Sequence, residues 1–137
     1  MTPLPPYARF LGIGTRRTDD GELHFVMPFG DVVLGRPGYV HGGAIAGLLE
    51  FAAFGALYEA LGPRHGVTVK PINVTVQYMR GATRHDTIAA ATVTRLGNRV
   101  ANVEAHAWQL DRARPIAAAQ MNLLLRRKDR PSPDIIA

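Results

Sequence analysis

The chain has 137 residues, of which 47% are hydrophobic and 20% charged, and its formal net charge is +5. This length suits one compact domain with a hydrophobic core, and the composition is that of a globular protein rather than of a disordered or collagen-like chain. The chain contains no cysteine, which excludes thiol catalysis, cysteine-based zinc sites and disulfide bonds.

The first part of the chain predicts short elements joined by turns. Residues 3–11 place prolines ahead of apolar and aromatic residues, which is typical of a short helix or an irregular arm. Residues 12–28 contain two strand-like runs around Asp19-Asp20-Gly21, so we expect a β-hairpin, followed by a glycine-rich, turn-forming stretch at 30–38. No positive region followed by an apolar run begins the chain, so we expect no secretory signal and a cytoplasmic location.

Residues 42–62, GGAIAGLLEFAAFGALYEALG, predict one long helix that ends at Gly62-Pro63. Its apolar length approaches that of a membrane span. The central Glu50, the glycines and the β-rich remainder of the chain favour instead the core helix of a folded domain. We therefore expect no membrane partner.

From Val67 onward the pattern changes to four β-rich runs, which cover residues 67–79, 87–96, 99–110 and 115–125. The connections between them are short, which implies antiparallel neighbours. A hairpin, one apolar helix and four antiparallel strands predict an α+β domain whose sheet wraps around the helix. We assign residues 1–137 to this single domain, with a core at about 12–126 and a flexible tail at 127–137.

One charged residue stands out in the predicted helix. Between Ala44 and Tyr58 the only charged side chain is Glu50, and its helical neighbours are apolar residues or glycine. A buried, unpaired carboxylate is costly or has a raised pKa, so a chain that keeps one often uses it in chemistry. The alternative is a structural role, in which Glu50 pairs with a core arginine, caps a backbone group or reaches a subunit boundary.

Directly before the helix stands His41-Gly42-Gly43. Glycines at a helix start let the backbone approach a ligand, and free N–H groups at that end suit developing negative charge, although such glycine pairs are also common in structural roles. Gly42 and Glu50 are eight residues apart, about 12 Å along one helix, which is too far for both to act on one carbonyl. If both are catalytic, they come from different subunits of a twofold dimer.

The motif of Gly38, His41-Gly42-Gly43 and then Glu50, nine residues after the histidine, resembles that of the PaaI-type acyl-CoA thioesterases of the hotdog superfamily. The resemblance spans roughly residues 20–125, and GVTVKPINVTVQYMRGA also looks like the first long strand after the helix in that family. It implies a hotdog fold, an antiparallel sheet wrapped around a long central helix, and hydrolysis of a thioester.

The resemblance also implies roles for individual residues. Gly42 would donate its backbone N–H to the thioester carbonyl oxygen, and His41 would set the loop and orient the substrate. Glu50 would be the nucleophile or the general base that activates water. Thr68 matches a position where relatives carry a Ser or Thr that positions the water or the carboxylate, its alternative being an ordinary strand threonine. The residues expected to line the substrate site are Gly43 and Phe54.

Two departures from the family pattern concern the same region. Many relatives have an asparagine six residues before the histidine, where this chain has Gly35, and many have aspartate in place of Glu50. Glutamate occurs in related hotdog thioesterases, so the loss of the asparagine is the larger change. It removes an expected polar contact to the loop or the reacting groups.

Coenzyme A ends in phosphates, and all but two of the 16 basic residues are arginine, whose guanidinium forms forked hydrogen bonds to phosphate. A bias in genomic base composition would produce the same arginine usage. By resemblance, the candidates for binding the phosphates lie at strand ends and turns, and they are Arg80, Arg84, Arg95 and Arg99.

The expected partners are an acyl-CoA or aroyl-CoA substrate and further copies of the chain, as a homodimer that shares its active sites and, by resemblance, as a tetramer. Coenzyme A is part of the substrate, so no separate cofactor is expected. The histidines show no metal-ligand spacing, and the scattered arginines form no basic-aromatic platform, so we expect neither a metal nor nucleic acid. Two alternatives stay open: a non-catalytic acyl-CoA-binding or sensing hotdog module, and a hotdog hydratase or dehydratase.

Overall fold

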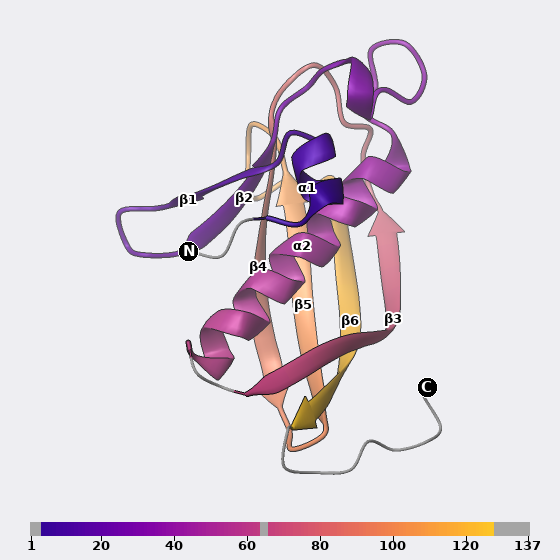
Figure 1. Ribbon diagram of the computed structural model, residues 1–137. Helices are drawn as coiled ribbons and strands as arrows, with labels where there is room; N and C mark the ends of the chain where they lie inside the picture. Colours follow the sequence, from indigo (N-terminus) through magenta and orange to yellow (C-terminus); the bar gives the residue numbers. More distant parts are fainter. Residues whose placement is uncertain (1–3, 64–65, 128–137) are drawn as a thin grey trace.

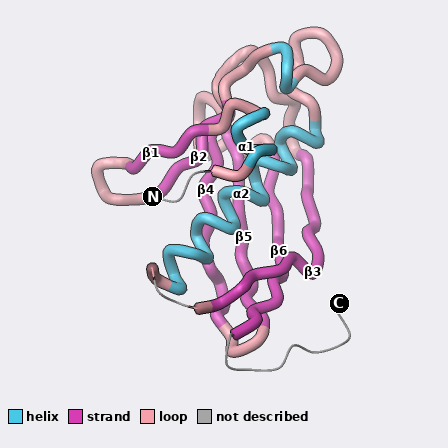
Figure 2. The backbone as a smooth tube through the Cα atoms, viewed as in Figure 1, coloured by secondary structure: helices cyan, strands magenta, loops and turns pink. Residues whose placement is uncertain are grey.

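The structure is a computed structural model that describes residues 4–63 and 66–127. These residues form one six-stranded antiparallel sheet, in the order β1-β2-β4-β5-β6-β3, around the helix α2 (Figure 1). The strands are β1 (Gly14–Arg17), β2 (Leu23–Met27), β3 (Val67–Tyr78), β4 (Thr87–Leu96), β5 (Val100–Trp108) and β6 (Ala117–Arg127), and the helices are α1 (Pro6–Phe10), the short 3-10 helix η1 (Asp31–Val33) and α2 (Gly42–Leu61). Figure 2 shows α2 lying across one face of the sheet, with α1 beside it.

The helix α2 begins and ends with residues that satisfy its exposed backbone groups. His41 has extended backbone angles, and its ring Nδ1 accepts a hydrogen bond from the Gly43 N–H at 2.9 Å, which makes it the N-cap. At the other end Gly62 has a φ of 85°, and its N–H bonds the Tyr58 carbonyl. The helix α2 is long and apolar enough to cross a membrane, but the core helix of a soluble protein meets the same criteria. In the folded domain, 44% of its most apolar 18-residue window is buried.

Small residues allow α2 to pack closely on the sheet. On the helix side of β4, β5 and β6, Ala89, Ala107 and Ala117 are fully buried. On the helix itself, Gly55 lies so near β2 that an added Cβ would be 2.5 Å from the Phe25 ring. Larger side chains at these places would push the helix away from the sheet, so the alanine-rich strands and the glycine in α2 are matched.

The strand β3 is an edge strand with one free side. It pairs with β6 along its length, and a bulge at Ile72 shifts the register. Within the described residues no strand pairs with the other edge of β3, where Ile72 and Val74 are exposed. A long edge strand with exposed apolar residues is a template for pairing with another strand.

The predicted elements are confirmed, because the hairpin, the long helix and the four later strands all form close to the predicted residues. Two limits of the core differ from the prediction. β6 continues through Arg127, which pairs with Val67 and so belongs to the strand rather than the tail, while residues 128–137 of the predicted tail lie outside the described residues. The core also begins before residue 12, because Ala8 and Leu11 are buried in the same cluster as residues of α2.

Candidate active site at the start of the central helix

The first turn of α2 presents a free backbone donor. The His41 N–H bonds the Val33 carbonyl at 2.7 Å, and the Gly43 N–H is taken by the His41 ring. Between them, the Gly42 N–H has no hydrogen-bond partner among residues 4–63 and 66–127. It is an unsatisfied donor at the positive end of the helix dipole, where an anionic oxygen can bind.

Arginines gather next to this helix start. The Arg84 guanidinium comes within 3.8 Å of the position that a Cβ would occupy on Gly38, and Arg80 belongs to the same connection between β3 and β4. The Arg36 guanidinium lies 4.1 Å from the centre of the Tyr39 ring. Sequence reasoning missed Arg36, because in the sequence it is one arginine in an exposed turn and only its contact with Tyr39 distinguishes it.

Three other predicted residues lie at the opposite end of the molecule. Arg95 and Arg99 flank the turn between β4 and β5, and Thr68 is the second residue of β3, near the end of α2 (Figure 1). Thr68 lies ten positions before Tyr78, the last residue of β3, which is about 33 Å of extended strand. One protomer therefore places Arg84 beside the loop that precedes Gly42 and Gly43, while the Arg80 guanidinium donates to the Pro115 carbonyl at 2.6 Å. Thr68, Arg95 and Arg99 lie at the other end.

Glu50 lies about two turns into α2, on the side that the sheet leaves uncovered. It is half-buried rather than fully enclosed, and Ala46 and Phe54, one turn before and after it, are also partly exposed. Burial raises the pKa of the Glu50 carboxyl above its ordinary value of 4.5. No ion pair or hydrogen bond to its carboxylate is found in the described part of the chain, so the predicted structural alternative of a partner arginine is not realised there.

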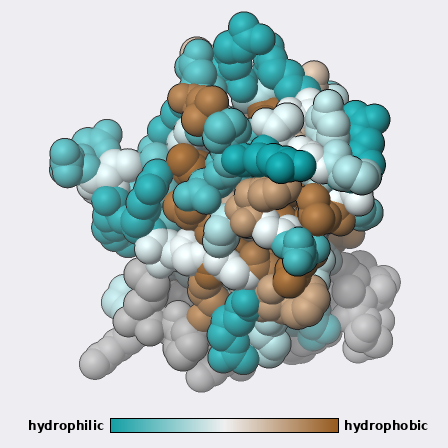
Figure 3. Space-filling view, turned by 90° about the horizontal axis from the view of Figure 1, so that it is seen from above, coloured by the Kyte–Doolittle hydropathy of each residue, from teal (hydrophilic) through white to brown (hydrophobic). Residues whose placement is uncertain are grey.

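The start of α2 lies at one end of the molecule (Figure 1). Figure 3 looks onto the end of the molecule where α2 begins and shows hydrophobic patches between polar ones. A shallow pocket of about 230 Å³ lies elsewhere, between the second half of α2 and β4, with Ala52, Ala56 and Ala91 in its walls. That pocket includes neither Glu50 nor Gly42, so it is not the candidate site.

The carboxylate of Glu22, the residue just before β2, has a very different environment from that of Glu50. Arg112 binds both carboxylate oxygens of Glu22, at 2.5 and 2.8 Å, and also donates to His106, while a ring nitrogen of the buried His24 lies 2.7 Å from the same carboxylate. The bond from Arg112, with a smaller contribution from His24, lowers the pKa of Glu22 to about 2 despite partial burial. No group of three or more potential metal ligands occurs among the described residues.

Residues 37–116 match the family model of the thioesterase superfamily. The match covers more than half of the chain, and the chain therefore belongs to the thioesterase superfamily. A protein of Halobacterium salinarum, provisionally named an esterase, is 35% identical over 98 residues, which cover 69% of this chain and 64% of that protein. The chain thus spans less than two thirds of the length of this relative.

Two crystal structures show the same fold. A Bacillus halodurans protein with CoA has a TM-score of 0.79 at 22% identity, covering 90% of this chain and 80% of that one. A phenylacetic acid degradation-related protein from Ralstonia eutropha, provisionally named a thioesterase, has a TM-score of 0.74 at 24% identity, covering 90% and 92%. Together with the family match, these similarities confirm the predicted hotdog fold.

Proposed function

We propose that this chain hydrolyses an acyl-CoA or aroyl-CoA thioester to free CoA and a carboxylic acid. The observation that carries the proposal is the unpaired carboxylate of Glu50, whose pKa is raised, on the open side of a helix that begins with the free Gly42 N–H. A general base or nucleophile and a preorganised backbone donor are the groups that acyl transfer requires. Membership of the thioesterase superfamily supports thioester hydrolysis as the general reaction.

In the proposed mechanism the Gly42 N–H binds the thioester carbonyl oxygen and stabilises the tetrahedral oxyanion. Ionised Glu50 either takes a proton from the attacking water or attacks the carbonyl carbon itself, forming an anhydride that water then opens. In both routes the C–S bond breaks, and the CoA thiolate leaves and is protonated. A raised pKa suits a carboxylate that must accept a proton near neutral pH.

Two subunits would complete the site. Gly42 and Glu50 of one chain are about 12 Å apart along α2, so one thioester cannot contact both. The free edge of β3 and the exposed Ile72, Val74 and Met79 provide a surface on which a second copy could pair about a twofold axis. Such a dimer would place the helix start of each subunit near the Glu50 of the other. A tetramer remains a prediction from the family resemblance.

The dimer also gives a role to residues that one protomer keeps apart. Antiparallel pairing of two β3 strands would bring Thr68, at the start of one strand, toward the end of the other, where the second subunit's helix begins. Arg80 and Arg84 are proposed to bind the CoA phosphates, together with Arg36. Coenzyme A is then part of the substrate, and no further cofactor is needed in a cytoplasmic enzyme.

One observation favours a second candidate, a module that binds acyl-CoA without hydrolysing it. A Cβ on Gly35 would lie 3.1 Å from the Cα of His41, so a side chain there would require the loop to shift. The asparagine that many relatives carry at this position would therefore fit only if this loop moved by a few tenths of an ångström. If its polar contact is essential for turnover, this chain would bind thioesters and leave them intact.

A panel of short, medium, long and aryl acyl-CoAs separates the two candidates. We expect release of free thiol from at least one substrate, with hydrolysis continuing over many turnovers. Equilibrium binding of the same compounds is measured in parallel. Binding without thiol release would exclude the hydrolase and establish the binding module, and neither binding nor release would exclude both.

A further inference from the structure

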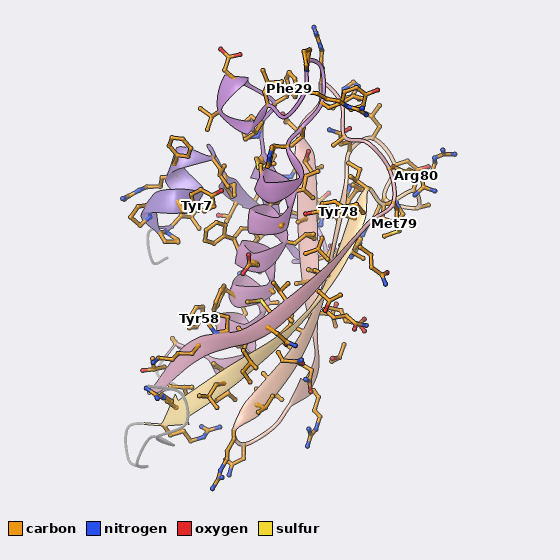
Figure 4. The ribbon with its side chains drawn as sticks, turned by 90° about the vertical axis from the view of Figure 1, so that its right-hand side faces the viewer. Tyr7, Phe29, Tyr58, Tyr78, Met79 and Arg80 are labelled. Atoms are coloured by element: carbon orange, nitrogen blue, oxygen red, sulfur yellow. The ribbon has the colours of Figure 1, made fainter. Side chains whose placement is uncertain are left out.

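The last residue of β3 contacts the first residue of α2. The Tyr78 hydroxyl donates a hydrogen bond to the Gly42 carbonyl at 2.8 Å, although the two residues are 36 positions apart in the sequence. Figure 4 shows Tyr78 projecting from β3 toward α2. A Cβ on Gly42 would lie 3.3 Å from the Tyr78 ring, and the φ of Gly42 is not positive. The tyrosine ring, not the backbone conformation, therefore disfavours a side chain at position 42.

Tyr78 and His41 hold the two ends of one peptide group. The Gly42 carbonyl and the Gly43 N–H belong to the same planar unit, which rotates only as a whole. Tyr78 donates to its oxygen, and the His41 Nδ1 accepts from its N–H at 2.9 Å. Rotation of this unit would break one or both bonds, so ψ of Gly42 and φ of Gly43 are restricted. The adjoining peptide group, which carries the free Gly42 N–H, is held at its His41 carbonyl by the N–H groups of Ala44 and Ile45, and the Gly42 Cα joins the two held groups.

We propose that Tyr78 is a positioning residue that aims the Gly42 N–H at the thioester oxygen, an inference that rests on the proposed function. A preorganised donor lowers the barrier because it needs no reorientation when the oxyanion forms. The Tyr78 hydroxyl has one proton, which it gives to the Gly42 carbonyl, so its effect on the substrate is indirect. Loss of the hydroxyl leaves the donor present but less well aimed, which lowers kcat more than it changes KM.

Tyr78→Phe tests the proposal, because it keeps the ring against Gly42 and removes only the hydroxyl. We expect kcat to fall by about 2- to 13-fold, the range for one hydrogen bond, with KM within about twofold of the unmodified protein. The oligomeric state should stay unchanged. Tyr7→Phe is the matched control, since the Tyr7 hydroxyl has no hydrogen-bond partner among the described residues and its ring packs against Phe10, Phe51 and Gly47. A kcat outside this range, or a matching rise in KM, overturns the assignment.

Amide hydrogen exchange separates a failure of this inference from a failure of the proposed function. In Tyr78→Phe the Gly43 N–H should exchange at least about threefold faster, because the peptide group is held at one end only. Tyr7→Phe should leave that exchange unchanged. If the protein hydrolyses no thioester, the proposed function fails. If the Gly43 N–H exchanges at the same rate in Tyr78→Phe and in the unmodified protein, the Tyr78 hydrogen bond does not hold this peptide group, and the inference fails.

Discussion

Glu50 and Glu22 are both partly buried carboxylates, yet their pKa values move in opposite directions. Two hydrogen bonds from Arg112 and one from His24 surround Glu22 and lower its pKa to about 2. Glu50 has no such partner in the described part of the chain, and burial alone raises its pKa. Within the described residues, the fold thus gives the Glu22 carboxylate two partner side chains and the Glu50 carboxylate none.

The difference separates a structural carboxylate from a reactive one. Glu22 joins the turn after β5 to the start of β2, and its ionised form is stabilised by groups that a substrate could not easily displace. Glu50 keeps its lone pairs available and holds its proton more readily, which is what a base or a nucleophile in an open site requires. Burial without a partner, rather than burial as such, is therefore the useful indicator of function here.

The largest expected effect is on activity. Glu50→Gln keeps the size of the side chain and removes its basicity, so thioester hydrolysis should fall by about 10²- to 10⁴-fold, the range for a general base. Glu59→Gln is the matched control, because Glu59 lies on the same helix, is exposed and pairs with Arg17. The rate of thiol release should be lower in Glu50→Gln than in Glu59→Gln by that factor. Equal rates in the two variants would show that Glu50 does not take part in the reaction.

A smaller effect is expected on stability in acid. The lowered pKa of Glu22 contributes stability that is fully present above its ordinary value of 4.5 and is lost as the pH falls toward about 2. Since Glu22 and Arg112 are both partly solvent-exposed, we expect Arg112→Met to cost only about 1 kcal/mol near neutral pH. Denaturant unfolding between pH 2 and 7 should show this loss shrinking in acid, with hydrolysis unaffected at neutral pH. A pH-independent loss would contradict the role assigned to this ion pair.

The smallest effect should have the opposite sign. Because its folded-state pKa is raised, ionised Glu50 costs the folded protein stability at every pH above that pKa. Glu50→Gln removes this charge and should raise the free energy of unfolding at neutral pH by about 0.5 kcal/mol, a gain of stability with loss of function. A lower thermal midpoint in Glu50→Gln would show that the carboxylate has a stabilising partner after all.

The sequence was sufficient for elements whose signals are local. The helix was predicted by its apolar run and its Gly62-Pro63 end, and Glu50 by being the one charge within that run. Contacts between distant parts of the chain had no such signal: Tyr78 meets Gly42 across 36 positions, and Arg112 meets Glu22 across 90. The sequence did not single out Arg36 for the same reason, because only its contact with the Tyr39 ring distinguishes it from other exposed arginines in turns.

The most direct test of the account compares the pH dependence of kcat/KM with the ionisation of Glu50 itself. Carbon-13 NMR of the Glu50 carboxyl gives its pKa in the free protein, and the acid limb of kcat/KM reports the group that must be ionised for reaction. We predict that the two midpoints coincide and lie above 4.5, with Glu22 titrating near 2 in the same spectra. An acid limb that differs from the Glu50 titration, or a Glu50 that ionises below 4.5, would contradict the account.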